Sequence, residues 1–176
     1  MTTATTATPA PASAPVNTKA AERRPLAFES LDAIRAEVNR LAQLGEEGII
    51  STGNWSAGQN LWHLERFMEC SLDGFDKKGP APLRWWLSAL FRKKALNSTE
   101  PFPSGVRLPK QASFLLPPDS VPLHEGAAKL LACLDRVDAG DRFTAQSPVL
   151  GNLSHEEWSL LHRKHAAMHL SFLHDA

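Results

Sequence analysis

The sequence predicts an all-α domain folded as a four-helix bundle. Four stretches carry apolar residues at the three-and-four spacing of an amphipathic helix. Two of them begin with a Ser-x-x-Gln or Ser-x-x-Glu capping box. No stretch shows the period-two alternation of a half-buried strand, so sheet is expected to be a minor component. Four long helices with a long insertion after the second one are typical of a bundle.

The first predicted helix runs from Ser30 to about Gln43. Ser30 is a favourable N-cap residue, and Gly45 and Gly48 end the helix. Its apolar stripe consists of Leu31, Ile34, Val38, Leu41 and Leu44.

The second predicted helix begins at Ser56, where Ser56 and Gln59 form a capping box, and Gly74 and Gly79-Pro80 mark its end. Polar and apolar residues share its inward stripe, which consists of Asn60, His63, Leu64, Phe67, Met68, Ser71 and Phe75.

An aromatic and basic segment, 83–96, predicts a short extra helix after the second one. Its Arg84–Lys94 part is expected to pack across the bundle with its cations in solvent. Contact with a membrane surface, a dimer face and a lid over a site are the alternatives left open. A long proline-rich loop, 97–123, follows this segment. Loops of this length in a compact domain are often functional or cover the core.

The last two helices are predicted over 123–137, before Gly140, and from Ser154 nearly to the C-terminus. Ser154 and Glu157 form the second capping box. The stripe of the final helix consists of Trp158, Leu161, His162, His165, Met168, His169 and Phe172.

The composition narrows the function classes. The 19 basic and 19 acidic side chains balance, which argues against a nucleic-acid partner. The two cysteines, Cys70 and Cys133, are too few for a disulfide framework and lack the spacing of metal ligands. No apolar run approaches the length of a membrane span, so a membrane-spanning helix is not expected. Contact of the Arg84–Lys94 part with a membrane surface is the less favoured interpretation.

The N-terminal region predicts a tail rather than a targeting signal. Residues 1–22 are rich in Ala, Thr and Pro and are expected to be disordered, whereas residues 23–176 form the helical domain. Because the tail has no basic start followed by an apolar core, a cytoplasmic location is expected.

Three histidines on two predicted helices form the candidate site. His165 and His169 are four residues apart, so both imidazoles face the same side of one helix. His63 lies on the apolar stripe of the second helix, where a buried imidazole needs a hydrogen-bond partner or a metal. The hypothesis is that all three bind one divalent ion and leave a position open, as in catalytic sites. The alternative is that each is an ordinary hydrogen-bonded core histidine.

His162 lies one turn before His165 and is a further candidate. Three positions are open for it: it binds the metal, it contacts a metal ligand, or it lies at the rim of the site. If the site is catalytic, His162 is the candidate proton shuttle.

The motif Trp55-Ser-x-Gly-Gln-x-Leu-x-His63-Leu and the terminal His165-x-x-x-His169 pair resemble the DinB-like superfamily of metal-binding four-helix bundles. Within it, the wider pattern resembles an uncharacterised bacterial branch known as a domain of unknown function. The pieces that carry this similarity are Arg24-Pro-Leu-x-Phe28, Gly53-Asn-Trp-Ser56 and Leu153-Ser-x-Glu-Glu-Trp158, and the similarity extends over about 24–173.

The resemblance implies an up-down-down-up bundle with a metal site made of His63, His165 and His169. Characterised members of the superfamily include thiol-dependent S-transferases, a thiol-dependent isomerase and bundle domains of sulfoxide synthases. The iron sites of the synthases resemble His-x-x-x-His-x-Glu, and Ser171 stands at the position of that Glu. This difference argues against a sulfoxide-synthase role.

The expected function is therefore that of a divalent-metal-binding protein. Zinc, nickel or iron is the expected ion, and the activity it suggests is a thiol S-transferase or a hydrolase acting on a small molecule. A low-molecular-weight thiol is the candidate second cofactor, and a homodimer is one candidate assembly. The alternative is a non-enzymatic or stress-associated bundle that keeps the metal for stability.

Overall fold

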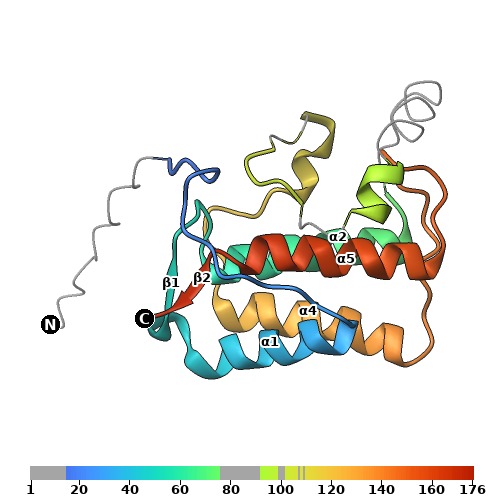
Figure 1. Cartoon of the computed structure of the whole chain (residues 1–176). Coiled ribbons are helices and arrows are strands. Elements are labelled where there is room, and N and C mark those ends of the chain that lie inside the picture. Colours follow the sequence, from blue (N-terminus) through green and yellow to red (C-terminus); the bar gives the residue numbers. More distant parts are fainter. Residues whose placement is uncertain (1–14, 76–91, 99–101, 107, 109) are drawn as a thin grey trace, which may run out of the picture.

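The computed structural model describes residues 15–75, 92–98, 102–106, 108 and 110–176. These residues form a mostly helical structure with one small two-stranded sheet, as Figure 1 shows. The prediction that the domain is built mainly of helices is therefore confirmed. In chain order the elements are α1 (Leu31–Leu44), η1 (Glu46–Gly48), β1 (Ile49–Ser51), α2 (Ala57–Asp73), η2 (Lys110–Leu115), α4 (Leu123–Asp138), α5 (His155–Leu170) and β2 (Leu173–Asp175).

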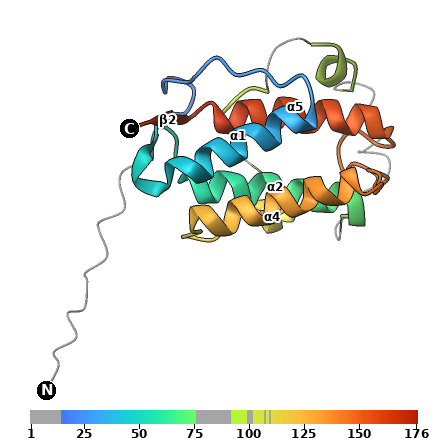
Figure 2. The same cartoon turned by 90° about the horizontal axis from the view of Figure 1, so that it is seen from below.

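The four long helices lie side by side in both views (Figures 1 and 2). Helices α1 and α2 each contact both α4 and α5. The colours in Figure 1 show that α1 and α5 run in one direction and α2 and α4 in the other. The side chains between them form one apolar core, whose largest fully buried members are Trp158, Phe143, Ile34, Leu41, Leu61, Leu130, Leu134 and Leu170.

Three of the predicted helix starts, at Ser30, Ser56 and Ser154, are confirmed at the level of individual hydrogen bonds. The Ser30 hydroxyl accepts a backbone N–H of the first turn of α1. Both capping boxes are complete: Ser56 and Gln59 begin α2, and Ser154 and Glu157 begin α5. Each box satisfies two N–H groups that have no partner inside the helix, which fixes where these helices begin.

Two glycines allow α2 and α4 to approach closely. A Cβ built on Gly58 would lie 2.0 Å from the backbone oxygen of Val121. A Cβ built on Gly126 would lie 2.6 Å from the backbone oxygen of Gly58. Since real Cβ atoms do not approach other atoms so closely, only glycine fits this helix contact.

The end of the chain differs from the expectation of a helix that continues nearly to the C-terminus. Helix α5 ends at Leu170, and the next residues form β2, which pairs antiparallel with β1. In the register, Ile50 lies opposite His174 and Ser51 opposite Leu173. The backbone hydrogen bonds of this pair depend on a partner far away in sequence, which helical periodicity cannot reveal.

The segments around the insertion are described in part. Residues 83–91 of the predicted extra helix lie outside the described residues, whereas residues 92–97 are helical. Arg92 binds the Glu157 carboxylate at 2.8 Å and so connects this helix to the start of α5. The loop predicted over 97–123 is not wholly irregular, because η2 forms within it and buries Leu115.

The predicted N-terminal tail is described from residue 15. Its residues 15–22 are held by hydrogen bonds against the connection between β1 and α2: Val16 bonds to Asn54, and the Glu22 carbonyl accepts from Thr52. Residues 1–14 lie outside the described residues. None of the helices in the described ranges is both long and apolar enough to cross a bilayer.

Candidate metal centre

Helices α2 and α5 bring three histidines together. One ring nitrogen each from His63, His165 and His169 lies within 4.8 Å of the other two. The ring centroids are separated by 5.0 Å for His63 and His165, 4.6 Å for His63 and His169, and 4.7 Å for His165 and His169. The predicted convergence of these residues is confirmed, and the group could hold a metal ion.

The His63 ring is fixed by the last residue of η2. His63 Nδ1 lies 2.6 Å from the Leu115 carbonyl oxygen, which can only accept a hydrogen bond. Nδ1 therefore carries the proton, and in the neutral ring the lone pair is on Nε2. This Nε2 faces the other histidines, at 3.2 Å from His165 Nε2.

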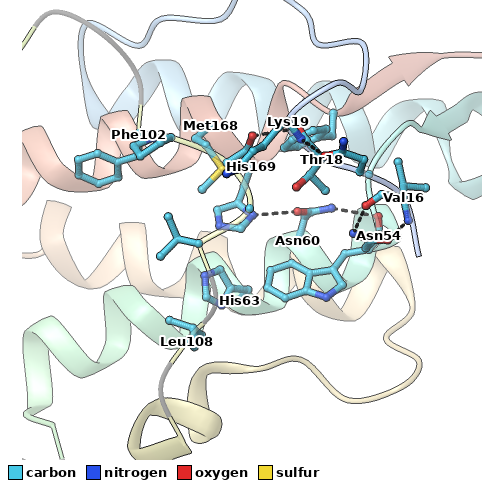
Figure 3. A pocket seen from close by; sticks show the side chains of 18 of the residues that line it. Val16, Thr18, Lys19, Asn54, Asn60, His63, Phe102, Leu108, Met168 and His169 are labelled. Atoms are coloured by element: carbon cyan, nitrogen blue, oxygen red, sulfur yellow. Dashed lines mark hydrogen bonds between the residues drawn. The ribbon is translucent and has the colours of Figure 1, made fainter. Parts of the chain in front are cut away.

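The His169 ring is fixed by Asn60, one turn before His63 on α2. The Asn60 amide nitrogen donates to the carbonyls of Trp55 and Ser56, at 3.2 Å and 3.0 Å. Its oxygen is thereby directed at His169 Nδ1, 3.1 Å away. Figure 3 draws this contact as a dashed line. His169 Nδ1 must donate in it, so its Nε2 also keeps a lone pair for the site.

His165 completes the group in a different way. Its Nδ1 is buried and has no hydrogen-bond partner among the residues that the structure describes. Its Nε2 faces His63 Nε2 at 3.2 Å. Two nitrogens at ~2.0–2.1 Å from a tetrahedral ion lie ~3.3 Å apart. The distance between the two Nε2 atoms, and the lone pair that His63 directs at His165, fit a divalent cation between them.

The electrostatics favour the neutral imidazoles that a metal requires. Burial lowers the pKa of His63, although its hydrogen bond to Leu115 acts in the opposite direction. Burial lowers the pKa of His165 and His169 well below the usual value, and the neighbouring histidines add to the effect. At neutral pH all three rings are therefore uncharged, and their lone pairs are available to a cation.

A cavity of about 690 Å³ opens beside the three histidines. Aromatic and aliphatic side chains form most of its wall: Trp55, Phe102, Val106, Leu108, Met168 and Phe172. Trp55 stacks on His169, with 5.4 Å between the ring centroids and 4° between the planes. Figure 3 labels His63, His169, Phe102, Leu108 and Met168 among the residues that line this cavity. Such a volume suits a small organic molecule.

The cavity is covered by two segments far apart in the sequence. Val16 exchanges two hydrogen bonds with the Asn54 side chain, at 2.6 Å and 3.0 Å. The Ser104 hydroxyl donates to the Thr18 carbonyl at 2.9 Å, which joins the two segments to each other. Residues 15–19 and 102–106 thus lie over the histidines that α2 and α5 position.

His162 lies outside the group of three histidines. It is only 2% exposed, and its Nε2 lies 2.8 Å from the Ser71 hydroxyl. Its ring packs among Phe67, Phe143 and Trp158. It is not among the described residues that line the cavity. The proton-shuttle role remains a prediction, and the observed contacts of His162 are those of a core residue.

Sequence reasoning did not assign a role to Asn60 or to the Leu115 carbonyl. An Asn on an otherwise apolar stripe, three residues before a candidate ligand, is a signal that could have identified Asn60. The Leu115 carbonyl carries no sequence signal, because any residue has one. The contribution of residues 15–19 was hidden by the tail-like composition of the N-terminus.

Comparison with known proteins identifies the family of the chain and no individual relative. No curated protein and no solved structure shows a significant match. Residues 20–176 match the family described as "Protein of unknown function (DUF1569)". The match includes all three histidines of the site and nearly the whole chain. This chain therefore belongs to the DUF1569 family.

Proposed function

We propose that the protein binds one divalent transition-metal ion through Nε2 of His63, His165 and His169. The observation that carries the proposal is the arrangement of these three rings around one point. In two of them a backbone or amide oxygen holds the opposite nitrogen, which is the usual support of metal-binding histidines. Zinc, nickel and iron all accept such an imidazole set.

The proposed centre has an open side that faces the cavity. Three protein ligands leave at least one coordination position, which is the pattern of catalytic rather than structural metal sites. A divalent cation at this point would supply Lewis-acid chemistry, by lowering the pKa of a thiol or a water molecule in the cavity. This chemistry suits a thiol S-transferase that uses a low-molecular-weight thiol, or a hydrolase.

The helix directions and the histidine positions support the assignment of the DUF1569 family to the DinB-like superfamily. In Figure 1, α1 and α5 are parallel and α2 and α4 run against them, as expected for an up-down-down-up bundle. The three histidines come from the second and the last long helix, as the resemblance implies.

The metal proposal is tested by elemental analysis of protein purified without an affinity tag. We expect about one equivalent of metal in the wild type and a loss of nearly all of it in His165→Ala. His124→Ala is the matched control, because His124 is exposed on α4 and lies outside the group. Equal metal content in the wild type and His165→Ala would contradict the proposal.

The catalytic part of the proposal is tested separately. The metal-loaded protein is assayed with a panel of thiols and electrophilic acceptors and with ester substrates, with and without a chelator. We expect turnover that depends on the metal. If the chelator lowers the melting temperature and no member of the panel is turned over, the non-enzymatic metal-binding module is the correct description.

A further inference from the structure

We propose that the cavity beside the histidines binds a small organic anion with an apolar body. In this proposal the positive charge of Lys19 favours an anion over a neutral or cationic ligand. This inference rests on the proposed metal site and names the class of ligand that the site takes. It follows from the charges and the wall of the cavity.

The three histidines would leave a bound cation with its charge uncompensated. Each is a neutral ligand, so an ion held by them keeps its full double positive charge. Among the residues described as lining the cavity, none is Asp or Glu. The polar lining groups other than the histidines and Lys19 are uncharged amides and hydroxyls, on Asn17, Thr18, Asn54, Asn60 and Ser104. A positive centre between apolar walls is stabilised by an anion that enters with the ligand.

Lys19 adds a positive charge to the same cavity. It is the one Lys or Arg among the described lining residues. Its aliphatic stem runs along Gly105: a Cβ at that glycine would lie 3.4 Å from Lys19 Cγ and 3.5 Å from Cε. The close-up in Figure 3 places Lys19 and Thr18 on the wall near His169. The stem therefore covers the rim while the ammonium group adds to the positive potential.

A second cation contacts a residue of this wall. The Arg23 guanidinium carbon is 5.7 Å from the centroid of the Phe172 ring, and Phe172 lines the cavity. Lys19 and Arg23, four positions apart in the N-terminal segment, thus both bring positive charge to this part of the molecule, which strengthens the preference for an anion.

The apolar wall of the cavity indicates that the part of the ligand away from its charged group is apolar. Phe102, Leu108 and Met168 face the cavity beside the histidines in Figure 3. Burying an apolar body against such side chains contributes about 25 cal/mol for each Å² removed from water. A simple anion such as acetate has almost no apolar surface to bury, so it is expected to bind weakly.

The test uses three ligands of nearly equal shape that differ in charge. Zinc-loaded protein is titrated calorimetrically with 4-phenylbutyrate, 4-phenylbutanamide and 4-phenylbutylamine, and with acetate as the small anion. Cobalt-loaded protein gives a second readout, because the visible spectrum of cobalt changes when a ligand reaches the ion. We expect phenylbutyrate to bind at least tenfold more tightly than each of the other three and to shift the spectrum.

Variants then test the role of Lys19. Lys19→Met keeps the stem and removes the charge, and we expect it to weaken the binding of phenylbutyrate about twofold to fivefold, as for a solvent-exposed charge pair. Lys19→Arg is expected to restore the affinity. Lys129→Gln removes the same charge on α4, outside the cavity, and is expected to have no effect.

The two proposals fail in different ways. If the protein does not bind zinc or cobalt, the metal site itself is wrong. If it binds the metal but takes the amide or the amine as tightly as phenylbutyrate, the metal site stands and the anion preference is wrong. Equal affinities of the wild type and Lys19→Met for phenylbutyrate would overturn the role of Lys19.

Discussion

Asn60 Oδ1 lies 3.1 Å from His169 Nδ1, and this contact determines which nitrogen of His169 faces the other histidines. Two backbone carbonyls occupy the amide nitrogen of Asn60, so the side chain cannot flip without losing both bonds. A residue outside the group of three histidines thus sets the orientation of one of the proposed metal ligands.

Replacing Asn60 should therefore weaken metal binding without removing a ligand. We expect Asn60→Ala to raise the Kd for zinc about 10–100-fold, because His169 loses the acceptor that holds its ring. The Kd is measured by competition with a chromogenic chelator. Asn39→Ala, on the exposed side of α1, is the control. An Asn60→Ala Kd within twofold of the wild-type value would show that the contact does not support the site.

The glycine contact between α2 and α4 predicts whether Gly126→Ala stabilises or destabilises the protein. In an exposed part of a helix, Gly→Ala stabilises by about 1 kcal/mol. At Gly126 the added Cβ would lie 2.6 Å from the Gly58 carbonyl oxygen, so we expect Gly126→Ala to destabilise the protein by about 1–3 kcal/mol. Urea unfolding measures the change. Ala132→Gly, at an exposed position of α4, measures the effect of helix propensity alone on the free energy of unfolding. A stabilised Gly126→Ala would contradict the close approach.

His162 should make the stability of the metal-free protein depend on pH. Burial lowers its pKa from 6.5 to about 3, so below pH 6.5 the unfolded chain takes up a proton that the folded chain does not. The contribution of this ring is fully present above pH 6.5 and is lost as the pH falls towards 3, by about 1.4 kcal/mol per pH unit.

The measurement compares urea unfolding at pH 7.0 and 5.5 in the presence of a chelator. His162→Phe removes the titrating group. Between pH 7.0 and 5.5, we therefore expect the unfolding free energy of this variant to fall by about 1 kcal/mol less than that of the wild type. His124→Gln, at the exposed position on α4, should leave the pH dependence unchanged. The same loss of stability in His162→Phe and the wild type would mean that His162 is not buried in its neutral form.

The cover formed by residues 15–19 should slow exchange at the site. Asn54→Ala removes two hydrogen bonds to Val16, each of which contributes about 1 kcal/mol. We expect a chelator to extract the metal severalfold faster from this variant, with little change in the equilibrium Kd. Asn152→Ala, at an exposed position before α5, serves as the control. An unchanged extraction rate would show that this segment does not limit access.

The sequence was sufficient for the features that depend on local spacing. The caps at Ser30, Ser56 and Ser154 follow from residues within one turn, and the His165 and His169 pair follows from helical periodicity. The position of His63 beside that pair was a prediction about packing. This prediction could be made because large apolar residues surround His63 on the stripe of α2, which indicates that the imidazole faces the core.

Other features depend on contacts between distant residues and could not be predicted in the same way. The β1–β2 pair joins residues more than 120 positions apart, and neither strand is longer than three residues. The hydrogen bond from His63 uses a backbone carbonyl, which is independent of residue type. The cover over the cavity comes from residues such as Val16 and Thr18, whose neighbours have the composition of a flexible tail.

The most direct test of the central claim is anomalous diffraction from crystals of the zinc-loaded, untagged protein at the zinc edge. The account predicts one strong peak at about 2.0–2.1 Å from Nε2 of His63, His165 and His169. It also predicts that Nδ1 of His63 and His169 remains bonded to Leu115 and Asn60. No peak between the three rings, with zinc bound only at exposed histidines such as His124, would contradict it.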